Sequence, residues 1–273
     1  MPELPEVQTI VSGLEPEIKG RKIIGFDLHC EKMLKLPLTK FKKAIINQKV
    51  ISITRHGKYI FLNLENNFSI ILHLRMTGQL LLKNLKASPD KHTHVVFRFQ
   101  DKNIFFRDLR KFGTIELIKT TDITKYIENK KLAPDALSIS FEKFQQNLSR
   151  KKTGLKAALL DQRVIAGIGN IYADEILFRE KLSPKYPVPK LTSKKIKSLL
   201  KSIKTILQKG IELKGTSLSD YVDSNGNKGQ NQHILKVHQQ KGKPCPLCGT
   251  AIIREKVAGR GSFFCPNCQN ISY

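Results

Sequence analysis

Two pairs of cysteines near the end of the chain restrict its folding more than any other feature. Cys245-Pro-Leu-Cys248 and Cys265-Pro-Asn-Cys268 are separated by sixteen residues. Two Cys-x-x-Cys pairs at this spacing can place four thiolates tetrahedrally around one zinc ion. Four thiolates leave no open coordination position, so the sequence predicts one structural Zn²⁺ that organises a segment too short to fold alone. Many modules of this kind only stabilise a fold.

The residues between the cysteine pairs contain a hairpin signal. Val257-Ala258-Gly259-Arg260-Gly261-Ser262 places one arginine between two glycines, which would let backbone and guanidinium approach a phosphate closely. The fifth cysteine, Cys30, ends a strand-like run, and we interpret it as a small buried hydrophobe rather than a reactive thiol.

The apolar pattern divides the rest of the chain in two. Residues 3–18 carry apolar side chains at helical spacing, and Gly20 follows as a stop signal. Strand-like runs come next, separated by turn signals: 22–30, 49–55, 58–64, 68–76, 93–99, 104–108 and 114–118. Helical spacing returns in 141–150, 155–163, 171–181 and 192–213. Residues 215–231 are rich in Gly, Ser, Asn and Asp, which predicts a mobile loop.

These patterns predict an α+β multidomain protein. We expect an N-terminal β-sandwich with an appended N-terminal helix over residues 1–133. A helical domain over 134–235 would include the loop 215–231, and a zinc-bound β-hairpin would occupy 236–273.

The charge balance points to a polyanionic partner. Lys and Arg number 48 against 23 Asp and Glu, which gives a net charge of +25. Nucleic acid is the partner that this excess favours. A ribosome-associated protein, or a genome that favours Lys codons, would show the same excess. No stretch approaches the roughly 20 apolar residues of a membrane span, so we expect an intracellular protein in which disulfides are rare.

The start of the chain permits two interpretations. Pro2-Glu3-Leu4-Pro5-Glu6 fits the first turn of a helix, where Pro and Glu are both favoured. Met followed by Pro is also a good substrate for Met removal, which would expose a secondary amine at Pro2. An α-amine titrates near 7.7 to 8.0, so an appreciable fraction is unprotonated and nucleophilic at neutral pH. It could attack sugar C1′ and form an iminium, with Glu3 adjacent for proton transfer.

Four separated motifs occur together with the cysteine module. They are Pro2 to Val7, Gly57-Lys58-Tyr59, His73-Leu74-Arg75-Met76-Thr77-Gly78, and Gly167-Ile168-Gly169-Asn170 continuing to Glu175. In this order the chain resembles the formamidopyrimidine-DNA glycosylase family over its full length. Leu4 favours the branch specific for oxidised purines over the endonuclease VIII branch, which typically opens Pro-Glu-Gly-Pro.

The resemblance implies an activity and a set of residues. The protein would be a bacterial, cytoplasmic, monomeric repair enzyme acting on double-stranded DNA with oxidised purines or abasic sites. Pro2 would form a Schiff base after excising 8-oxoguanine or a formamidopyrimidine, and β,δ-elimination would cleave the strand. The resemblance implies catalytic roles for Pro2, Glu3, Lys58 and Arg260, and DNA-binding roles for His73, Met76, His92, Arg110, Phe112, Lys152 and Asn170. The helical domain would be the family's helix-two-turn-helix, and 215–231 its lid over the flipped base.

Several of these residues also have ordinary structural interpretations. Lys58 could be a solvated turn lysine, Glu6 an exposed first-turn acid and Phe112 a core residue. Lys151 could replace Lys152 as the DNA contact. Gln8 stands where the family commonly has glutamate, and Thr77 where some members do, so the preferred lesion stays open. Asn170 has a separate argument, because free N–H groups at a helix N-terminus behind glycines form an anion site. A non-catalytic zinc protein that binds nucleic acid is the alternative from another class.

Overall fold

The structure is a computed structural model that describes residues 1–270, so residues 271–273 of the expected zinc domain lie outside the described part. The chain forms two compact units. The first contains Met1–Asn129 and Ile211–Gln232, and the second contains Lys130–Gly210 and the residues from His233 onward. The first division falls close to the expected boundary after residue 133.

The first unit begins with the expected helix. α1 (Leu4–Ile18) buries Leu4, Val7, Ile10, Val11, Leu14 and Ile18, the apolar positions at helical spacing. The helix ends at the expected place, and Gly20 then adopts a φ of 80° that L-residues disfavour. α1 packs against β2 and β3, so its buried face belongs to the core of the first unit.

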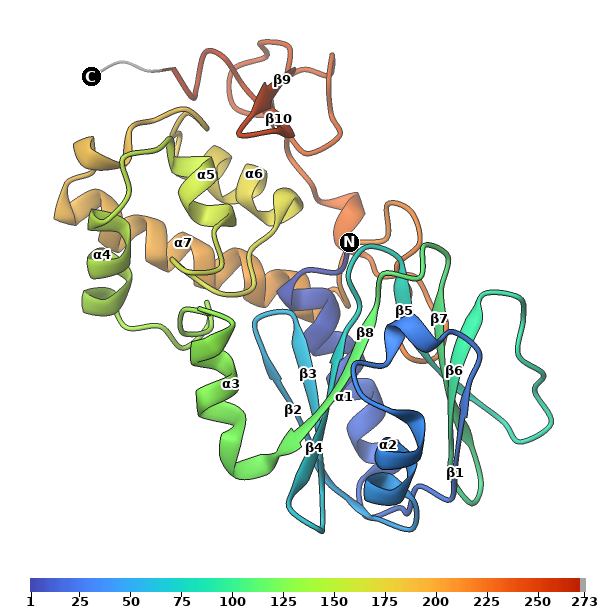
Figure 1. The fold of residues 1–273 in the computed structure, drawn as a ribbon. Helices are drawn as coiled ribbons and strands as arrows, with labels where there is room; N and C mark the ends of the chain where they lie inside the picture. Colours follow the sequence, from blue (N-terminus) through green and yellow to red (C-terminus); the bar gives the residue numbers. More distant parts are fainter. Residues whose placement is uncertain (271–273) are drawn as a thin grey trace. The chain divides into compact units, whose positions relative to one another are not determined.

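Two antiparallel sheets form the predicted β-sandwich (Figure 1). One sheet has the order β2-β3-β4-β8, from β2 (Val50–His56), β3 (Tyr59–Leu64), β4 (Phe68–His73) and β8 (Thr114–Lys119). The other has the order β1-β6-β7-β5, from β1 (Gly25–Leu28), β6 (Thr93–Arg98), β7 (Asn103–Asp108) and β5 (Gly78–Lys83). One buried apolar cluster contains residues of α1 and of both sheets, as expected when two sheets pack face to face.

Three regular elements were absent from the sequence prediction. β5 has only three consecutive leucines, Leu80 to Leu82, between Gln79 and Lys83, so it shows no alternation, and it pairs with β7 along its whole length. α2 (Leu38–Ile45) is short and buries only Phe41 and Ile45. α3 (Ile123–Asn129) buries only Tyr126. Such short elements lack a sustained period, and tertiary packing decides their conformation.

The segment 211–232 differs from the expectation of a mobile loop in the helical domain. It groups with the first unit, and Tyr221 is buried in the sandwich core. Ser224 O accepts a hydrogen bond from Leu82 N of β5 at 2.7 Å, and Thr216 N donates to the Glu6 carboxylate at 2.7 Å. These contacts are distant in sequence and leave no local periodic signal. The segment lacks a strand or long helix, but a buried side chain and these hydrogen bonds tie it to the first unit.

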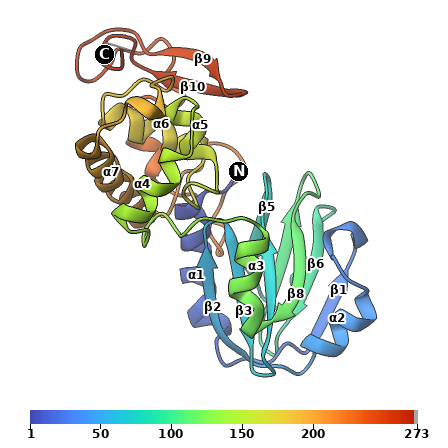
Figure 2. The same cartoon turned by 60° about the vertical axis from the view of Figure 1, so that its left-hand side comes forward.

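The second unit has the expected helices, with slightly shorter bounds (Figure 2). They are α4 (Phe141–Ser149), α5 (Leu155–Leu160), α6 (Asn170–Arg179) and α7 (Ser193–Glu212). The expected hairpin is also present, as β9 (Ile253–Val257) paired with β10 (Arg260–Phe264). β10 packs against α6. Short 3₁₀ helices occupy Glu31–Met33, Thr120–Asp122, Val188–Lys190 and Asn231–His233.

α7 is the longest helix, and a stripe of lysines interrupts its apolar residues. Within residues 1–270, none of the helices combines the length and the apolar character needed to cross a bilayer.

Candidate active site and nucleic-acid interface

The N-terminus of α1 is a buried cluster of two acids beside a proline. Pro2 is buried, Glu3 is 2% exposed and Glu6 is 1% exposed. Glu3 N donates to Glu6 Oε2 at 2.8 Å, and the Glu3 side chain accepts the N–H of Glu6 in return. This reciprocal capping satisfies two N–H groups that a helix end leaves open. The first-turn interpretation of this motif is therefore correct, and it holds Glu3 directly beside Pro2.

Glu6 is held from a second side by the segment 211–232. Its Oε1 accepts the N–H of Thr216 at 2.7 Å. Gly215 has a φ of 80°, and a Cβ there would lie 2.9 Å from Glu6 Cγ, so both backbone conformation and space require glycine. Glu6 is thus not the exposed first-turn acid that its sequence position allows. Its bonds make it a structural partner of Glu3.

Lys58 lies in the two-residue turn between β2 and β3, where His56 pairs with Tyr59. Its side chain is only 7% exposed, so the interpretation as a solvated turn lysine is wrong. Gly57 has a φ of 57°, as this type of hairpin turn requires. Arg55 Nη1 donates to Gly57 O at 2.9 Å, and Arg55 Nε donates to Gln8 Oε1 at 3.1 Å. Gln8 therefore ties the turn of Lys58 to α1.

His73 ends β4 in a fixed orientation. Its Nδ1 accepts the N–H of Arg75 at 3.0 Å, which places the ring proton of the neutral imidazole on Nε2. Tyr59 packs edge-on against the ring with centroids 4.5 Å apart. A neutral His73 can therefore donate one hydrogen bond from Nε2, which suits a phosphate oxygen.

Met76, Arg110 and Phe112 meet at the tips of two loops of the first unit. Arg110 Nη1 lies 3.0 Å from Met76 Sδ, and its guanidinium carbon lies 4.7 Å from the centre of the Phe112 ring. Met76 is 41% exposed and Phe112 is 47% exposed, so Phe112 is not a core residue. His92 is half-buried, and its carbonyl accepts the N–H of Asp108 at the base of one of these loops.

Asn170 opens α6 in the second unit, as the sequence predicts. Gln162 shapes the preceding loop, since its side chain accepts the N–H of Gly167 at 2.8 Å and donates to Ile168 O at 2.9 Å. Asn170 Nδ2 donates to Gly261 O at 3.0 Å. An open cavity of about 500 Å³ lies here, lined by Asn170, His238, Gln239, Arg254, Gly261 and Phe263. The cavity lies at the N-terminus of α6, and Arg254 is the positively charged residue of its lining.

The two candidate lysines before α5 differ in their partners. Lys151 Nζ lies 2.6 Å from Asp161 Oδ2, whereas Lys152 is exposed. The Arg163 guanidinium and then Lys151 hold the pKa of Asp161 well below its usual range. Asp161 is therefore a persistent counter-charge for Lys151, which favours Lys152 as the residue available to DNA.

Arg260 begins β10 and is exposed. Ala258 and Gly259 form the turn, with φ values of 49° and 74°. The sequence prediction of a hairpin tip at this position is confirmed. The arginine projects from a two-residue turn next to Gly261, whose carbonyl is held by Asn170.

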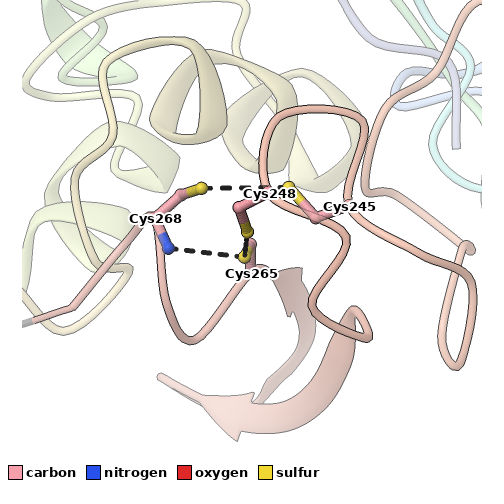
Figure 3. Close-up of side chains that lie close together, drawn as sticks. All are labelled: Cys245, Cys248, Cys265 and Cys268. Carbon is pink, nitrogen blue, oxygen red and sulfur yellow. Dashed lines mark hydrogen bonds between the residues drawn. The ribbon is translucent and has the colours of Figure 1, made fainter.

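The four paired cysteines converge on one point (Figure 3). Their sulfur atoms all lie within 4.8 Å of one another, with 3.9 Å between Cys245 and Cys268 and 3.5 Å between Cys248 and Cys265. A tetrahedral zinc with Zn–S bonds of about 2.3 Å would place its sulfur ligands roughly 3.8 Å apart. The thiols form no disulfide. These four residues hold one structural zinc.

Sequence reasoning missed a buried ionic network in the second unit. Lys156 Nζ, fully buried, lies 2.6 Å from Asp174 Oδ1 and 2.7 Å from Ser262 Oγ. Asp174 Oδ2 in turn lies 2.7 Å from His238 Nδ1. The available signal was a lysine at an apolar position of α5, because buried lysines need a paired charge. The network joins α5 and α6 to β10, the strand that carries Arg260.

Comparison with known proteins gives concordant matches along the chain. The family model described as "Formamidopyrimidine-DNA glycosylase N-terminal domain" matches residues 1–115, and its "H2TH domain" matches residues 132–222. The model "Zinc finger found in FPG and IleRS" matches residues 242–271.

Individual relatives match this chain over almost their whole length. A formamidopyrimidine-DNA glycosylase of Pelotomaculum thermopropionicum is 40% identical over 99% of this chain and 100% of its own. One of Listeria monocytogenes is 38% identical, over 98% and 100% respectively. A Lactococcus lactis relative in complex with Fapy-dG DNA superposes with a TM-score of 0.94 at 38% identity, covering 98% of this chain and 100% of its own. A Lactococcus lactis complex with abasic-site DNA gives 0.93 at 37% identity, covering 98% and 99%.

Proposed function

This chain belongs to the formamidopyrimidine-DNA glycosylase family and acts in base-excision DNA repair as a glycosylase and lyase, and we propose that the amine of Pro2 carries both reactions. The observation that carries this proposal is the buried N-terminus of α1, where Glu3 is capped in place beside Pro2. Removal of Met1 would turn the Pro2 nitrogen into a secondary amine. About half of such amines are neutral near pH 8.

The proposed sequence of bonds follows from that amine. The Pro2 nitrogen attacks sugar C1′ and the damaged base leaves with its bonding electrons and a proton. Opening of the sugar ring at O4′ gives an iminium that withdraws electrons from C2′. Loss of a C2′ proton then breaks the C3′–O3′ bond, and loss of a C4′ proton breaks the C5′–O5′ bond. The strand is left with phosphate on both sides of a one-nucleotide gap. Water then hydrolyses the remaining iminium, which releases the unsaturated sugar fragment as an aldehyde and frees the Pro2 amine.

Proton transfer is assigned to Glu3 rather than Glu6. Both carboxylates are buried, but Glu6 accepts N–H groups from Glu3 and Thr216. Those two bonds fix the Glu6 carboxylate between α1 and the segment 211–232, which gives it a supporting role. Glu3 directly follows the nucleophile in the chain and can protonate the ring oxygen as C1′ is attacked.

The DNA is held by residues from both units in this proposal. Lys58 and His73 contact phosphates from the first unit and Lys58 also assists elimination, with His92 as a further contact. Lys152 and Asn170 contact phosphates from the second unit, and Arg260 assists the last elimination. Met76, Arg110 and Phe112 fill the space that the extruded nucleotide leaves, because a duplex cannot keep such a void. The zinc supports the hairpin and supplies no chemistry to the reaction. We place this activity in the bacterial cytoplasm, on a monomeric enzyme.

Oxidised purines are the proposed substrates, 8-oxoguanine and formamidopyrimidines. Duplexes that carry 8-oxoguanine or thymine glycol, mixed at equal concentration, test this on one denaturing gel. We expect the 8-oxoguanine strand to be cut first and to end in phosphate on both sides. Preferential cutting of the thymine-glycol strand would instead assign the specificity of the endonuclease VIII branch. Intact strands in both duplexes would leave only DNA binding and contradict the enzymatic proposal.

A further inference from the structure

A fully buried carboxylate lies beneath the two loops that carry Met76, Arg110 and Phe112. Asp108 is the last residue of β7, and its side chain is 0% exposed. The first loop connects β4 to β5 and contains Met76, and the second connects β7 to β8 and contains Arg110 and Phe112. Asp108 is absent from the residues assigned above to chemistry or DNA binding.

Both oxygens of this carboxylate are bonded, and Oδ1 bonds to both loops. Oδ1 accepts the hydroxyl of Thr77 at 2.5 Å and the N–H of Arg110 at 3.1 Å. Oδ2 accepts the N–H of Gly113 at 2.7 Å. The hydroxyl of Thr77 also accepts the N–H of Arg110 at 3.1 Å. One charge therefore fixes the residue after Met76 and the residues that bracket Phe112.

The backbone around this carboxylate is constrained further. Its own carbonyl lies 3.0 Å from His94 Nε2, and burial lowers the pKa of His94, so the neutral ring can donate this bond. A Cβ on Gly113 would lie 2.5 Å from the ring of Phe106 in β7, and one on Gly78 would lie 2.9 Å from the same ring. Both loops thus approach β7 more closely than any larger residue permits.

The exposed tips contain strained backbone beside the functional side chains. Arg75 has a φ of 54° and Lys111 a φ of 57°, in the left-handed region that side-chain-bearing residues disfavour. Such conformations persist where surrounding bonds over-determine them, and they concentrate at functional sites. Here Arg75 precedes Met76, and Lys111 separates Arg110 from Phe112. Asp108 bonds to Thr77, two residues after Arg75, and to Arg110 and Gly113 on either side of Lys111 and Phe112.

We propose that Asp108, acting through Thr77, is a positioning residue that assembles Met76, Arg110 and Phe112 into one wedge before DNA binds. This inference rests on the void-filling role proposed above. Preassembly removes the entropy cost of ordering three side chains during base extrusion. It also gives Thr77 a role apart from lesion recognition, since its hydroxyl faces Asp108 rather than a ligand.

The test separates wedge assembly from the covalent chemistry. Thr77→Val removes the hydroxyl at nearly constant shape, and Thr77→Ser keeps it. Thr93→Val is the matched control, because Thr93 donates the same kind of bond to Asp90 at 2.7 Å on the neighbouring strand β6. Met76→Ala removes part of the wedge itself, and Asp108→Asn removes the charge. Asp108 is buried, so Thr77→Val carries the test if Asp108→Asn does not fold.

Three measurements are compared for each variant. They are the fluorescence change of 2-aminopurine opposite the lesion on binding, the single-turnover rate of 8-oxoguanine release from a duplex, and the cleavage of single-stranded abasic DNA, which contains no void. We expect Thr77→Val to slow both the 2-aminopurine fluorescence change and the release of 8-oxoguanine about tenfold. This is the loss typical of one hydrogen bond to a charged group. Cleavage of single-stranded abasic DNA by Thr77→Val, and every rate of Thr77→Ser and Thr93→Val, should stay within about twofold.

The outcomes separate this inference from the function that it builds on. Equal losses of Thr77→Val on all substrates would show general damage to the fold and overturn the inference. If Met76→Ala slows the 2-aminopurine change and 8-oxoguanine release but Thr77→Val slows neither, the positioning role is overturned and the wedge remains supported. An unchanged 2-aminopurine signal in Met76→Ala would overturn the wedge, and the inference with it.

Discussion

Buried carboxylates have different roles in the two units. In the first unit Glu3 and Glu6 lie at the very start of α1, next to Pro2, and bond mainly to backbone of their own turn and of the segment 211–232. In the second unit Asp174 and Glu175 lie in the middle of α6. Asp174 is paired with the Lys156 ammonium and with His238. Glu175 accepts three consecutive N–H groups, of residues 236, 237 and 238.

This difference shows that burial alone does not identify a catalytic acid. The carboxylates of the second unit are bonded to partners that join α5, α6, β10 and residues 236–238. Glu3 is held by the capping box at the start of α1, next to Pro2, the residue to which we assign the nucleophilic amine. The position of the acid relative to a nucleophile therefore distinguishes chemistry from support.

Removal of zinc should have the largest effect, and it should be confined to the second unit. Structural zinc contributes about 10 kcal/mol or more to folding in small modules, so a chelator should unfold residues 242–270. Hydrogen exchange followed by mass spectrometry would report this as fast exchange in β9 and β10, with β2 to β4 still protected. Readdition of zinc should restore the protection. Equal loss of protection in the sandwich would contradict the expected confinement of the effect to the second unit.

The two units also show which structural features could be predicted from the sequence. Short motifs indicated Pro2, Lys58, Asn170 and the cysteines, because their chemistry depends on neighbours in the chain. Periodicity indicated the sandwich and the helices. It could not indicate that Tyr221 enters the core of the first unit, since that contact joins residues far apart in sequence.

The partners of the buried charges could likewise not be read from the sequence, although Lys156 at an apolar position of α5 signalled that it needs one. Lys156 and Asp108 are charged residues of types that usually lie on the surface. Only the folded chain brings Asp174 to Lys156, and Thr77 to Asp108. Gln8 looked like a departure from the family pattern, but its oxygen receives Arg55 Nε and supports the turn of Lys58.

Lys156→Met should produce the next largest effect, on stability. It leaves Asp174 buried opposite a methyl group, and breaking a buried ion pair costs about 3 to 5 kcal/mol. Urea unfolding would measure the loss, with the exposed Lys201→Met on α7 as control. Adding Asp174→Asn to Lys156→Met should recover part of it. An unchanged unfolding midpoint for Lys156→Met would remove the distinction drawn between supporting and catalytic charges.

Glu3→Gln should lower the reaction rate and leave stability nearly unchanged, the reverse of the effect expected for Lys156→Met. We expect base release in single-turnover assays to fall about a hundredfold or more, the contribution typical of a general acid, while the affinity for lesion DNA stays nearly constant. The amide can still cap α1, so the fold should persist. Glu15→Gln on the exposed face of the same helix provides the control. A comparable rate for Glu3→Gln and the native protein would assign proton transfer to another group.

The smallest expected effect concerns an acid of the first unit that is half exposed. Burial alone would raise the pKa of Asp90, but bonds from Arg107 and Thr93 lower it from 3.8 to about 2. Because the folded pKa is depressed, the stabilisation is present above pH 3.8 and is lost as the pH falls toward 2. Solvent screening limits it to less than about 1 kcal/mol. Asp90→Asn should therefore be slightly less stable than the native protein at pH 7 and equal to it near pH 2. A constant difference across this range would exclude the ion pair as its cause.

Identification of the atom that becomes attached to DNA tests the central claim most directly. Native protein and a variant that retains Met1 are incubated with 8-oxoguanine duplex and borohydride, and the crosslinked peptide is sequenced by mass spectrometry. We predict one adduct on the Pro2 nitrogen of the native protein and none in the variant. An adduct on Lys58, or an equal yield when Met1 is retained, would contradict the assignment of Pro2 as the nucleophile.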